Sequence, residues 1–558
     1  MTSRFVEWSG LPGICRSSPI QLAFCRAVFA VTLVGIFGPI GHAQIATLDK
    51  GHQLLVDNGL QIWGLDQCAG CSFNYNGLAN ANFNGVVWSW NVDNAPHPKL
   101  TSLSSGQKWG KWQDPNISPA SALDATETSK SADLLALQVG DEQQSDLENP
   151  NGVTNAWFQA AHSGNYFQNQ LLYVNSFYVG SDAAYANFIA SAKPDAISFD
   201  SYPFDSPYGS IIYPHNWLAK AGQFRRHALS SYLGIGSNAP RPYGMYLQTY
   251  ASRSEGTRDP GDVEMRWQQF TAWTMGFTFV DAFTVSGSGS LFNGGDMNSP
   301  TQPRYSQFAE TARQGRNLGP ALTHLISYGY GPSIVVGKDA AGTPNPVPGD
   351  WLPFNKSNAP PNQQYLTSVA ATNIGTKNNG QPGDVYIGFF NPLLTSYGDP
   401  TGTAYFMVMN ALGPYLNDPT ATVADCMQRI ALDFDFTGST ITSLQRLRRS
   451  DGQVEIVPLT HLTGNQYRLT FDLEGGTGDL FKYNDGSPFV GVQFPPITSY
   501  WDNDATAGNN NTGTGAGLGG SGNWDTSANK WFNGSSNASW AANDNAVFWG
   551  TAGTVTLT

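Results

Sequence analysis

Charged residues are scarce in this chain of 558 residues, since only 13% are Asp, Glu, Lys or Arg. Basic residues are the scarcer kind, with 29 Lys and Arg against 42 Asp and Glu, which leaves a formal net charge of −13. A chain with this balance lacks the basic surface that binds nucleic acids and anionic lipids, so neither is expected as a partner. Amides, hydroxyls and aromatic rings are plentiful instead, which suits a protein that handles neutral polar ligands.

Long apolar runs are absent beyond the first 43 residues, so we expect no integral membrane span in the mature chain. The N-terminus has the order of a secretory signal peptide: Arg16 and Arg26 precede the apolar segment 27–37, and Ala43 closes a small-residue cleavage site. We therefore predict a signal peptide over residues 1–43. The mature protein is expected to be secreted or associated with the cell surface.

Cysteine is rare, with five residues in the whole chain. Cys15 and Cys25 lie within the predicted signal peptide. Cys68 and Cys71 have a spacing that also occurs in redox and zinc sites, but there is no second pair to complete a zinc site. In an exported chain we expect a local disulfide between Cys68 and Cys71 instead. Cys426 is expected to be a buried free thiol.

The sequence also lacks the motifs of several other chemistries. It has no His-Glu-x-x-His helix, no Gly-x-Ser-x-Gly elbow and no phosphate loop. His97, His162 and His215 are scattered without the spacing of metal ligands. We therefore expect neither a metal site nor a cofactor.

Between residues 50 and 320, short apolar runs alternate with helical patterns, which indicates a parallel sheet. The expected strands are 59–65, 85–90, 134–139, 171–175, 196–200, 243–248 and 277–283. Seven strands over this length fit an eight-stranded α/β TIM barrel better than an open sheet. We predict that the barrel covers residues 44–325 and that its missing strand lies between Asn91 and Lys130.

The pattern changes after a last helical segment at 305–325. Residues 326–495 alternate apolar and polar side chains with period two, and turn residues separate the runs, which predicts an antiparallel β-sandwich. Residues 496–558 begin with a Gly-, Asn- and Thr-rich linker and continue with widely spaced tryptophans. The chain is thus expected to contain a signal peptide, a barrel, a sandwich and a short C-terminal β-region.

Polar side chains follow several of the barrel strands at their carboxyl ends, where parallel barrels hold their active sites. The buried run 134–139 ends in Gly140 and two adjacent carboxylates, Asp141 and Glu142. Asp200 and Tyr202 follow the strand at 196–200. Two amides, Asn175 and Gln248, end the strands at 171–175 and 243–248 and are expected to bind hydroxyl groups of a ligand.

The barrel segment resembles bacterial secreted TIM-barrel glycoside hydrolases. Five motifs in order carry the resemblance: 139–143, 173–175, 195–203, 246–248 and 264–279. The resemblance implies that Glu142 is the acid/base, which would protonate the leaving oxygen of a glycosidic bond. The alternative is that Asp141 or Glu142 caps the next helix, a role that we expect more for Asp141 than for Glu142.

The second carboxylate is the open point of this resemblance. Gln248 stands where retaining relatives have a nucleophilic glutamate, and an amide cannot form a glycosyl ester. Asp200 could act as nucleophile or as base, and Asp281 or Glu255 could reach in from neighbouring positions. Otherwise the barrel binds a sugar without hydrolysing it. Asp200 also has a structural alternative, in which it binds its own loop.

The aromatic residues of the first two strands, Trp63 and Trp90, are candidates for stacking on sugar rings, although strand aromatics are more often core residues. Residues 500–558 resemble the autotransporter-associated β-strand repeat of bacterial surface proteins, through the motifs 523–525, 529–531 and 550–557. The expected function is therefore a secreted glycoside hydrolase that acts on a poly- or oligosaccharide. The alternatives are a carbohydrate-binding surface adhesin without catalysis and a structural autotransporter passenger.

Overall fold

The computed structural model describes residues 47–557, except for 69, 90–95, 205–211, 252–255, 288, 294–295, 361–362, 395–403, 493–497, 526 and 541–544. The predicted signal peptide, Trp90 and Glu255 therefore lie outside the described residues. None of the helices within the described ranges is both long enough and apolar enough to cross a membrane.

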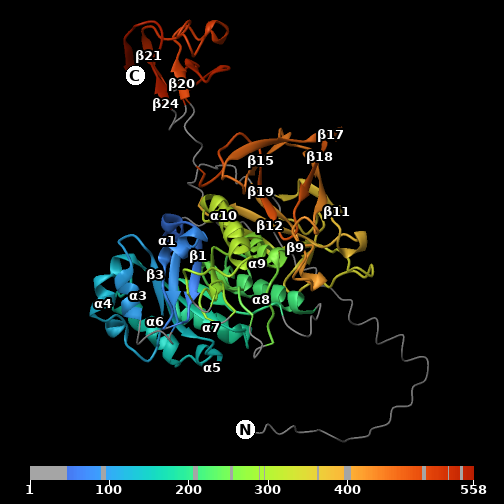
Figure 1. Cartoon of the computed structure of the whole chain (residues 1–558). Helices are drawn as coiled ribbons and strands as arrows, with labels where there is room; N and C mark the ends of the chain where they lie inside the picture. Colours follow the sequence, from blue (N-terminus) through green and yellow to red (C-terminus); the bar gives the residue numbers. More distant parts are fainter. Residues whose placement is uncertain are drawn as a thin grey trace, which may run out of the picture. The chain divides into compact units, whose positions relative to one another are not determined.

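Eight parallel strands close into a barrel in chain order, which confirms the predicted TIM-barrel fold (Figure 1). The strands are β1 (Gln61–Asp66), β2 (Gly85–Trp88), β3 (Trp109–Gln113), β4 (Leu134–Asp141), β5 (Leu171–Ser176), β6 (Ala196–Phe199), β7 (Tyr243–Gln248) and β8 (Phe279–Phe283). The strand that the sequence left unassigned is β3, and it lies between Asn91 and Lys130 as expected. Its short and interrupted apolar pattern, Trp-Gly-Lys-Trp-Gln, explains why periodicity alone did not locate it.

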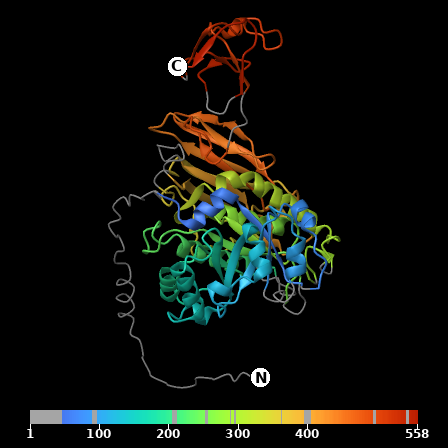
Figure 2. The ribbon, with the colours of Figure 1, turned by 90° about the vertical axis from the view of Figure 1, so that its left-hand side faces the viewer.

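Helices connect successive strands and surround the barrel (Figure 2). They are α1 (Lys50–Asn58), α2 (Tyr75–Asn80), α3 (Pro96–Ser102), α4 (Ala125–Ser129), α5 (Gln144–Leu147), α6 (Val153–Ser163), α7 (Asp182–Ala192), α8 (Ile212–Ala228), α9 (Asp262–Met275) and α10 (Arg304–Leu322). Local signals mark several starts: Ser181 caps α7, and the Glu264 carboxylate in α9 accepts a hydrogen bond from the Gly261 amide. Glu264 is thus a helix-start residue, and its ion pair with Arg258 anchors the loop before α9.

The barrel is filled by side chains and is not a pore. A cluster of buried residues from every strand except β3 occupies the interior, among them Trp63, Tyr173, Tyr246 and Phe279. A second, larger core lies between the strands and the surrounding helices and continues into the following sheet. This packing fixes the strand ends, and with them the loops that carry the polar side chains.

Two antiparallel sheets follow the barrel and form the predicted β-sandwich. One sheet has the order β10-β9-β12-β13-β19-β15-β16 and the other β11-β14-β18-β17. Their bounds are β9 (Leu325–Val335), β10 (Leu352–Pro353), β11 (Leu366–Asn373), β12 (Val385–Pro392), β13 (Tyr405–Asn410), β14 (Gln428–Asp435), β15 (Ser443–Leu447), β16 (Val454–Pro458), β17 (Thr460–Thr463), β18 (Gln466–Leu473) and β19 (Gly478–Tyr483). The core between the sheets is apolar and aromatic, with Phe406, Phe434 and Phe481 near its centre.

The sandwich packs against the barrel helices. Helix α9 contacts β12 and β13, and Gly388 in β12 comes so close that a Cβ there would lie 1.7 Å from the Thr274 carbonyl oxygen. Arg225 of α8, fully buried, donates to Ser327 Oγ (2.9 Å) and to the Gly329 carbonyl oxygen (2.8 Å). These bonds hold α8 in place, which matters because α8 also borders the barrel mouth.

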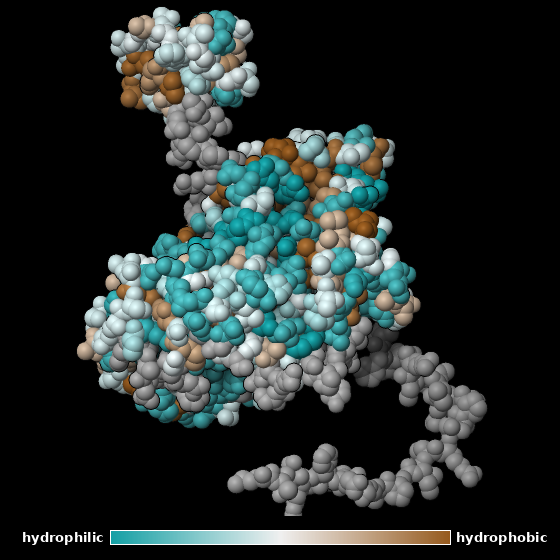
Figure 3. Space-filling model, in the orientation of Figure 1, coloured by the Kyte–Doolittle hydropathy of each residue, from teal (hydrophilic) through white to brown (hydrophobic). Residues whose placement is uncertain are grey.

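The C-terminal segment forms short strands around a cluster of tryptophans that meet edge to face or tilted. Its strands are β20 (Thr498–Trp501), β21 (Gly522–Trp524), β22 (Trp531–Phe532), β23 (Asn537–Ala538), β24 (Asn545–Val547) and β25 (Val555–Leu557). Trp524, Trp531 and Trp540 contact one another with ring centroids 4.5–4.8 Å apart. In the space-filling view, hydrophilic and neutral residues dominate the described surface and hydrophobic residues form separate patches (Figure 3).

Candidate active site

A cleft of about 920 Å³ opens at the carboxyl ends of the barrel strands. Residues that follow β1, β4, β5, β6, β7 and β8 line it, together with one face of α8 and the sandwich residues Gly349 and Asp350. A narrow extension of about 40 Å³ continues from it into the barrel, and the two spaces share Gln67, Asp141, Asp200 and Phe283. This is the end of the barrel at which TIM-barrel enzymes hold their active sites.

The end of β4 is distorted so that two adjacent carboxylates line the cleft. The register between β4 and β5 shifts between the pairs Gln138↔Tyr173 and Asp141↔Asn175, which marks a β-bulge. Gly140 has φ +72° and Glu142 has φ +52°, a left-handed conformation that is unfavourable for a glutamate. In a regular strand, Asp141 and Glu142 would point to opposite faces. The bulge and the left-handed residue bring both side chains to the cleft.

Asp141 belongs to this site and does not cap a helix, contrary to the role we favoured for it from the sequence. Its Oδ1 accepts hydrogen bonds from Gln138 Nε2 and Asn175 Nδ2, each at 2.9 Å. Asp146 takes the capping role instead, since its carboxylate accepts from the Val153 and Thr154 amides at the start of α6. Burial and the neighbouring Glu142 raise the pKa of Asp141 and the two amide donors lower it, and together they bring it to about 6.

Asp200 and Glu142 form a pair of interacting carboxyl groups. Asp200 follows β6 and is only 7% exposed, whereas Glu142 is exposed in the cleft. Burial raises the pKa of Asp200 well above its ordinary value, and a hydrogen bond with Glu142 and the charges of Glu142 and Asp141 raise it further. The Oδ1 atom of Asp200 has no hydrogen-bond partner among the described residues. The pair therefore retains a proton at a pH at which isolated carboxyls are ionised.

A lysine that sequence inspection missed stands beside this pair. Lys220 of α8 lines the cleft, and its Nζ donates to Ser201 Oγ (3.3 Å) and to the Phe177 carbonyl oxygen (3.2 Å). The same Nζ lies 3.9 Å from the centroid of the Phe177 ring. Burial lowers the pKa of Lys220, while the charges of Asp200 and Glu142 raise it. No strand-end motif contains Lys220, so only the position of α8 could have revealed it.

Aromatic side chains form one wall of the cleft. Tyr202 stacks on Phe283 (ring centroids 5.1 Å apart) and meets Tyr250 edge to face (5.3 Å). The Tyr202 hydroxyl has no hydrogen-bond partner among the described residues, and burial raises its pKa well above the ordinary value. Tyr202 thus lies at the site as expected, whereas Tyr250 and Phe283 were not anticipated. Phe177, 46% exposed, stands at the rim of the cleft.

The side chain of Gln248, which was expected to bind sugar hydroxyls, makes its hydrogen bonds to backbone groups instead. It is fully buried, and its Nε2 donates to the carbonyl oxygens of Phe204 (2.9 Å), Arg258 (2.8 Å) and Tyr250 (3.4 Å). Its Oε1 accepts from the Phe204 amide (2.9 Å). These bonds tie the loop after β6 to the loop after β7 and leave the amide with no group for a ligand. Gln248 is a structural residue, and the end of β7 presents no carboxylate to the cleft.

The other strand residues that were proposed for binding lie below the cleft. Trp63 is fully buried in the barrel interior against Phe279 and Tyr173, so it is a core residue and not a stacking platform. Asn175 is 1% exposed and lines the narrow extension, where it orients Asp141. Asp281, one of the alternatives for the second carboxylate, is enclosed in the interior with both oxygens lacking a partner among the described residues. Burial raises its pKa well above the ordinary value.

A hydrogen-bond chain in the barrel interior supports Asp141 from below. Gln138 Oε1 accepts from the hydroxyls of Tyr173 (3.1 Å) and Tyr246, so its Nε2 is directed to Asp141.

Cys68 and Cys71, on the loop after β1, form a disulfide near the other side of the cleft. No group of three or more His, Cys, Asp or Glu side chains that could hold a metal ion occurs in the described part of the chain.

No protein-family model matches the chain, and no curated protein matches it. Among solved structures, the α-amylase of Geobacillus thermoleovorans in complex with acarbose is similar with a TM-score of 0.33 and 8% identity, over 76% of this chain and 98% of that chain. A Bacteroidetes-affiliated GH5 cellulase linked with a polysaccharide utilization locus is similar with a TM-score of 0.28 and 11% identity, over 48% of this chain and 92% of that chain. Likenesses of this size carry no argument about activity, so the geometry of the cleft must carry it.

Proposed function

We propose that this chain is a glycoside hydrolase that cleaves O-glycosidic bonds of a poly- or oligosaccharide. One observation carries the proposal: Glu142 and Asp200 line the same cleft at the carboxyl end of a TIM barrel, and the charge of Glu142 raises the pKa of Asp200. Two carboxyls, one protonated and one ionised, are the groups that glycosidic cleavage requires. The bulge and the left-handed Glu142 support the proposal, because strained backbone of this kind occurs preferentially at functional sites.

Burial favours Asp200 as the proton donor and Glu142 as the ionised partner, which exchanges the role that the resemblance implied for Glu142. Asp200 would transfer its proton to the leaving oxygen while that oxygen takes the electron pair of the breaking bond. Glu142 would attack the anomeric carbon and form an ester. A water molecule would then give a proton back to Asp200, and its oxygen would replace Glu142 on the sugar.

The electrostatic coupling of the two carboxyls is the ground on which this two-step route is proposed in place of direct attack by water. Retaining enzymes hold their carboxyls ~5 Å apart and inverting enzymes ~6.5–9.5 Å apart, so the stereochemistry of the product tests the choice. Lys220 interacts electrostatically with both carboxyls, so its charge stabilises whichever of them is ionised. The export predicted from the N-terminal sequence agrees with this proposal, because polysaccharides are found outside the cell and at its surface.

The test uses aryl glycosides and polysaccharides with the wild type, Asp200→Asn and Glu142→Gln. If Asp200 donates the proton, Asp200→Asn loses 10²- to 10⁴-fold on substrates with poor leaving groups and little on dinitrophenyl glycosides, which need no proton. Glu142→Gln loses activity on both classes, and the exposed control Asp57→Asn on neither. The opposite pattern would restore Glu142 as the acid. Equal activity in all variants would refute the carboxyl pair.

A second candidate function is carbohydrate binding without hydrolysis. The observation that favours it is the end of β7, where a buried amide with no free hydrogen-bonding group replaces a carboxylate. Binding of oligosaccharides by the wild type without release of any product would support this candidate and exclude the hydrolase.

A further inference from the structure

The loop after β1 is held by an unusually dense set of bonds around one buried carboxylate. Asp66, fully buried at the end of β1, accepts hydrogen bonds from Lys99 Nζ (2.7 Å), Trp88 Nε1 (3.1 Å) and Ser286 Oγ. It also accepts from the Cys68 amide (3.1 Å). An ion pair at this burial is stable only when further hydrogen bonds satisfy the carboxylate, as they do here.

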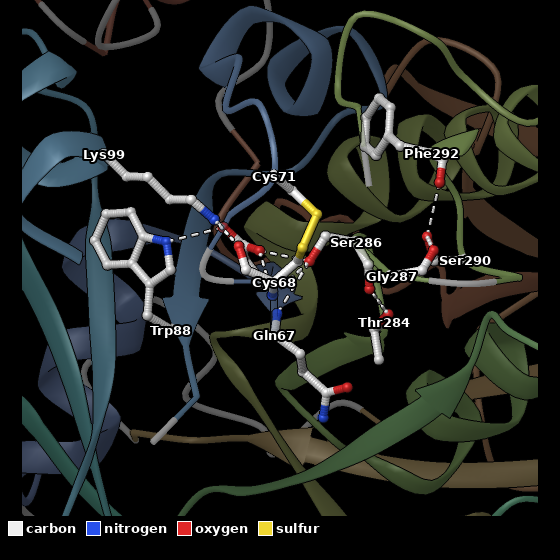
Figure 4. The surroundings of a disulfide bond; sticks show 11 residues. Gln67, Cys68, Cys71, Trp88, Lys99, Thr284, Ser286, Gly287, Ser290 and Phe292 are labelled. Atoms are coloured by element: carbon white, nitrogen blue, oxygen red, sulfur yellow. Dashed lines mark hydrogen bonds and ion pairs between the residues drawn. A yellow bond between two sulfur atoms is a disulfide. The ribbon is translucent and has the colours of Figure 1, made fainter. Parts of the chain in front are cut away.

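A disulfide closes the same loop. Cys68 and Cys71 are bonded across a separation of three residues, and Lys99 Nζ also donates to the Cys68 carbonyl oxygen (Figure 4). Ser286, from the segment after β8, joins the two neighbouring loops because its Oγ accepts from the amides of Gln67 (3.0 Å) and Cys68 (3.2 Å). The backbone around Gln67 is therefore fixed on both sides.

Among the described residues of this loop, Gln67 is the one that lines the cleft. It borders both the wide cleft and the narrow extension, in company with Asp141, Asp200 and Phe283. In Figure 4 its side chain extends away from the disulfide. Within the described residues, the side-chain carboxamide of Gln67 makes no hydrogen bond, whereas its backbone N–H donates to Ser286 Oγ. A fixed backbone with an unoccupied donor and acceptor is the arrangement of a preorganised binding residue.

We infer that Gln67 binds two adjacent hydroxyl groups of a neutral sugar ring in the cleft, and that the Asp66 cluster and the disulfide hold it in position for this. A carboxamide offers one acceptor oxygen and two N–H donors in one plane, which matches neighbouring hydroxyls. The inference deepens the proposed function, since it assigns a hydroxyl-bearing, uncharged ring to the same cleft. It places the sugar between the loop after β1 on one side and the carboxyls after β4 and β6 on the other.

The ligand class follows from the charges of these walls. Asp141, Glu142 and Asp200 face the cleft with Lys220 as the cation beside them. A uronate or sulfated ring placed against Gln67 would bring a further negative charge toward Asp141 and Asp200, which costs free energy. An unsubstituted ring avoids that cost and uses both functions of the amide.

The experiment measures binding rather than turnover, with Glu142→Gln as the background so that bound sugar is not consumed. The probes are cello-, manno-, xylo- and malto-tetraose, titrated by calorimetry, with a tetragalacturonate as the charged comparison. Adding Gln67→Ala should weaken binding of the best neutral probe about tenfold, the loss of one to two hydrogen bonds. Gln168→Ala, at an exposed glutamine, is the matched control and should change nothing.

A probe that lacks one of the two hydroxyls shows whether Gln67 contacts that hydroxyl or acts only by maintaining the structure of the loop. Deoxy analogues of the best probe should bind more weakly to the background protein but equally well with and without Gln67→Ala. The double variant Cys68→Ala/Cys71→Ala should weaken binding two- to fivefold with an unchanged fold by circular dichroism. Equal affinity of Gln67→Ala and its background, preference for the galacturonate, or no binding of any neutral probe would overturn the inference. Gln67-dependent binding by a wild type that hydrolyses nothing would uphold it while refuting the proposed hydrolysis.

Discussion

The ends of β4 and β7 both carry polar residues at the barrel mouth, yet only one of them serves the cleft. At β4 a bulge and two left-handed residues bring Asp141 and Glu142 to the cleft. At β7 the strand pairs with β8 in regular register up to Gln248, whose amide is consumed by four backbone bonds. A polar residue at a strand end is therefore functional only if its hydrogen-bonding capacity remains free and its backbone points it outward.

The difference also explains why β7 ends in a glutamine and not in a glutamate. Three carbonyl oxygens surround the Nε2 of Gln248, and each needs a donor. A carboxylate has none to offer, so a nucleophile at this position would require another arrangement of the loops after β6 and β7. The proposed function therefore takes its carboxyls from the ends of β4 and β6, which line the cleft.

The largest effect is expected for Gln248→Glu, which tests whether the end of β7 can take over the role of the β4 end. The free energy of unfolding should fall by about 3–5 kcal/mol, because a buried carboxyl would face three carbonyl oxygens without a donor. Urea denaturation measures this, and Gln168→Glu at an exposed position should stay within about 0.5 kcal/mol of the wild type. A stable Gln248→Glu variant with higher turnover would show that the two strand ends are interchangeable.

A smaller effect is expected for Gly140→Ala, which tests the bulge at β4. Both Gly140 (φ +72°) and the exposed Gly106 (φ +87°) are left-handed, so alanine should cost each about 1–2 kcal/mol of stability. At Gly140 the new Cβ would also lie 3.2 Å from Gln143 Oε1 and Thr154 Oγ1, whereas it meets nothing at Gly106. Only Gly140→Ala should lower the rate of sugar turnover, by tenfold or more, since small displacements of a reacting group cost up to about 10²-fold. Equal rates in both variants would mean that the bulge does not position the carboxyls.

The smallest effect is a shift of the pH profile in Asp141→Asn. The pKa of Asp141 lies at about 6, so above that pH its negative charge raises the pKa of Asp200. Removing the charge lowers the pKa of Asp200, and the alkaline limb of the pH–rate profile should move down by about one unit. An unchanged alkaline limb would mean that the charge of Asp141 does not affect the pKa of Asp200.

The same variant has a consequence for stability. A folded-state pKa of about 6 against an ordinary value of 3.8 means that Asp141 favours the folded state fully below pH 3.8 and loses this contribution as the pH rises to about 6. Asp141→Asn should lack that part of the pH dependence in urea titrations. Burial also raises the pKa of Asp281, so its carboxyl acts on stability in the same direction.

Much of the fold was predictable from the sequence because local patterns report burial directly. The alternation of apolar runs and helical segments predicted a closed parallel barrel, and the interval from Asn91 to Lys130 correctly contained the strand that its own residues concealed. The period-two alternation after residue 326 predicted the sandwich for the same reason. The spacing of Cys68 and Cys71, together with the expected export, also predicted the disulfide that the structure contains.

The site was predictable only in part. The sequence indicated the strand ends with Glu142, Asp200 and Tyr202, which do line one cleft. It indicated Gln248 and Trp63 equally, but both are buried. Gln248 is hydrogen-bonded to the backbone, and Trp63 packs in the barrel interior. Gln67 and Lys220 carried no signal, because the first follows a strand without a distinctive motif and the second belongs to a helix.

By itself, then, the sequence determined the kinds of side chain at the strand ends and the alternation that closes the barrel, because both depend on residues that are near one another in the chain. The tertiary structure alone decided which of those side chains face the cleft. A one-residue bulge reverses the direction of every side chain beyond it, and hydrogen bonds from distant loops decide whether an amide is free or consumed. Both effects depend on contacts between residues far apart in sequence, such as Gln248 with Phe204 and Asp66 with Ser286.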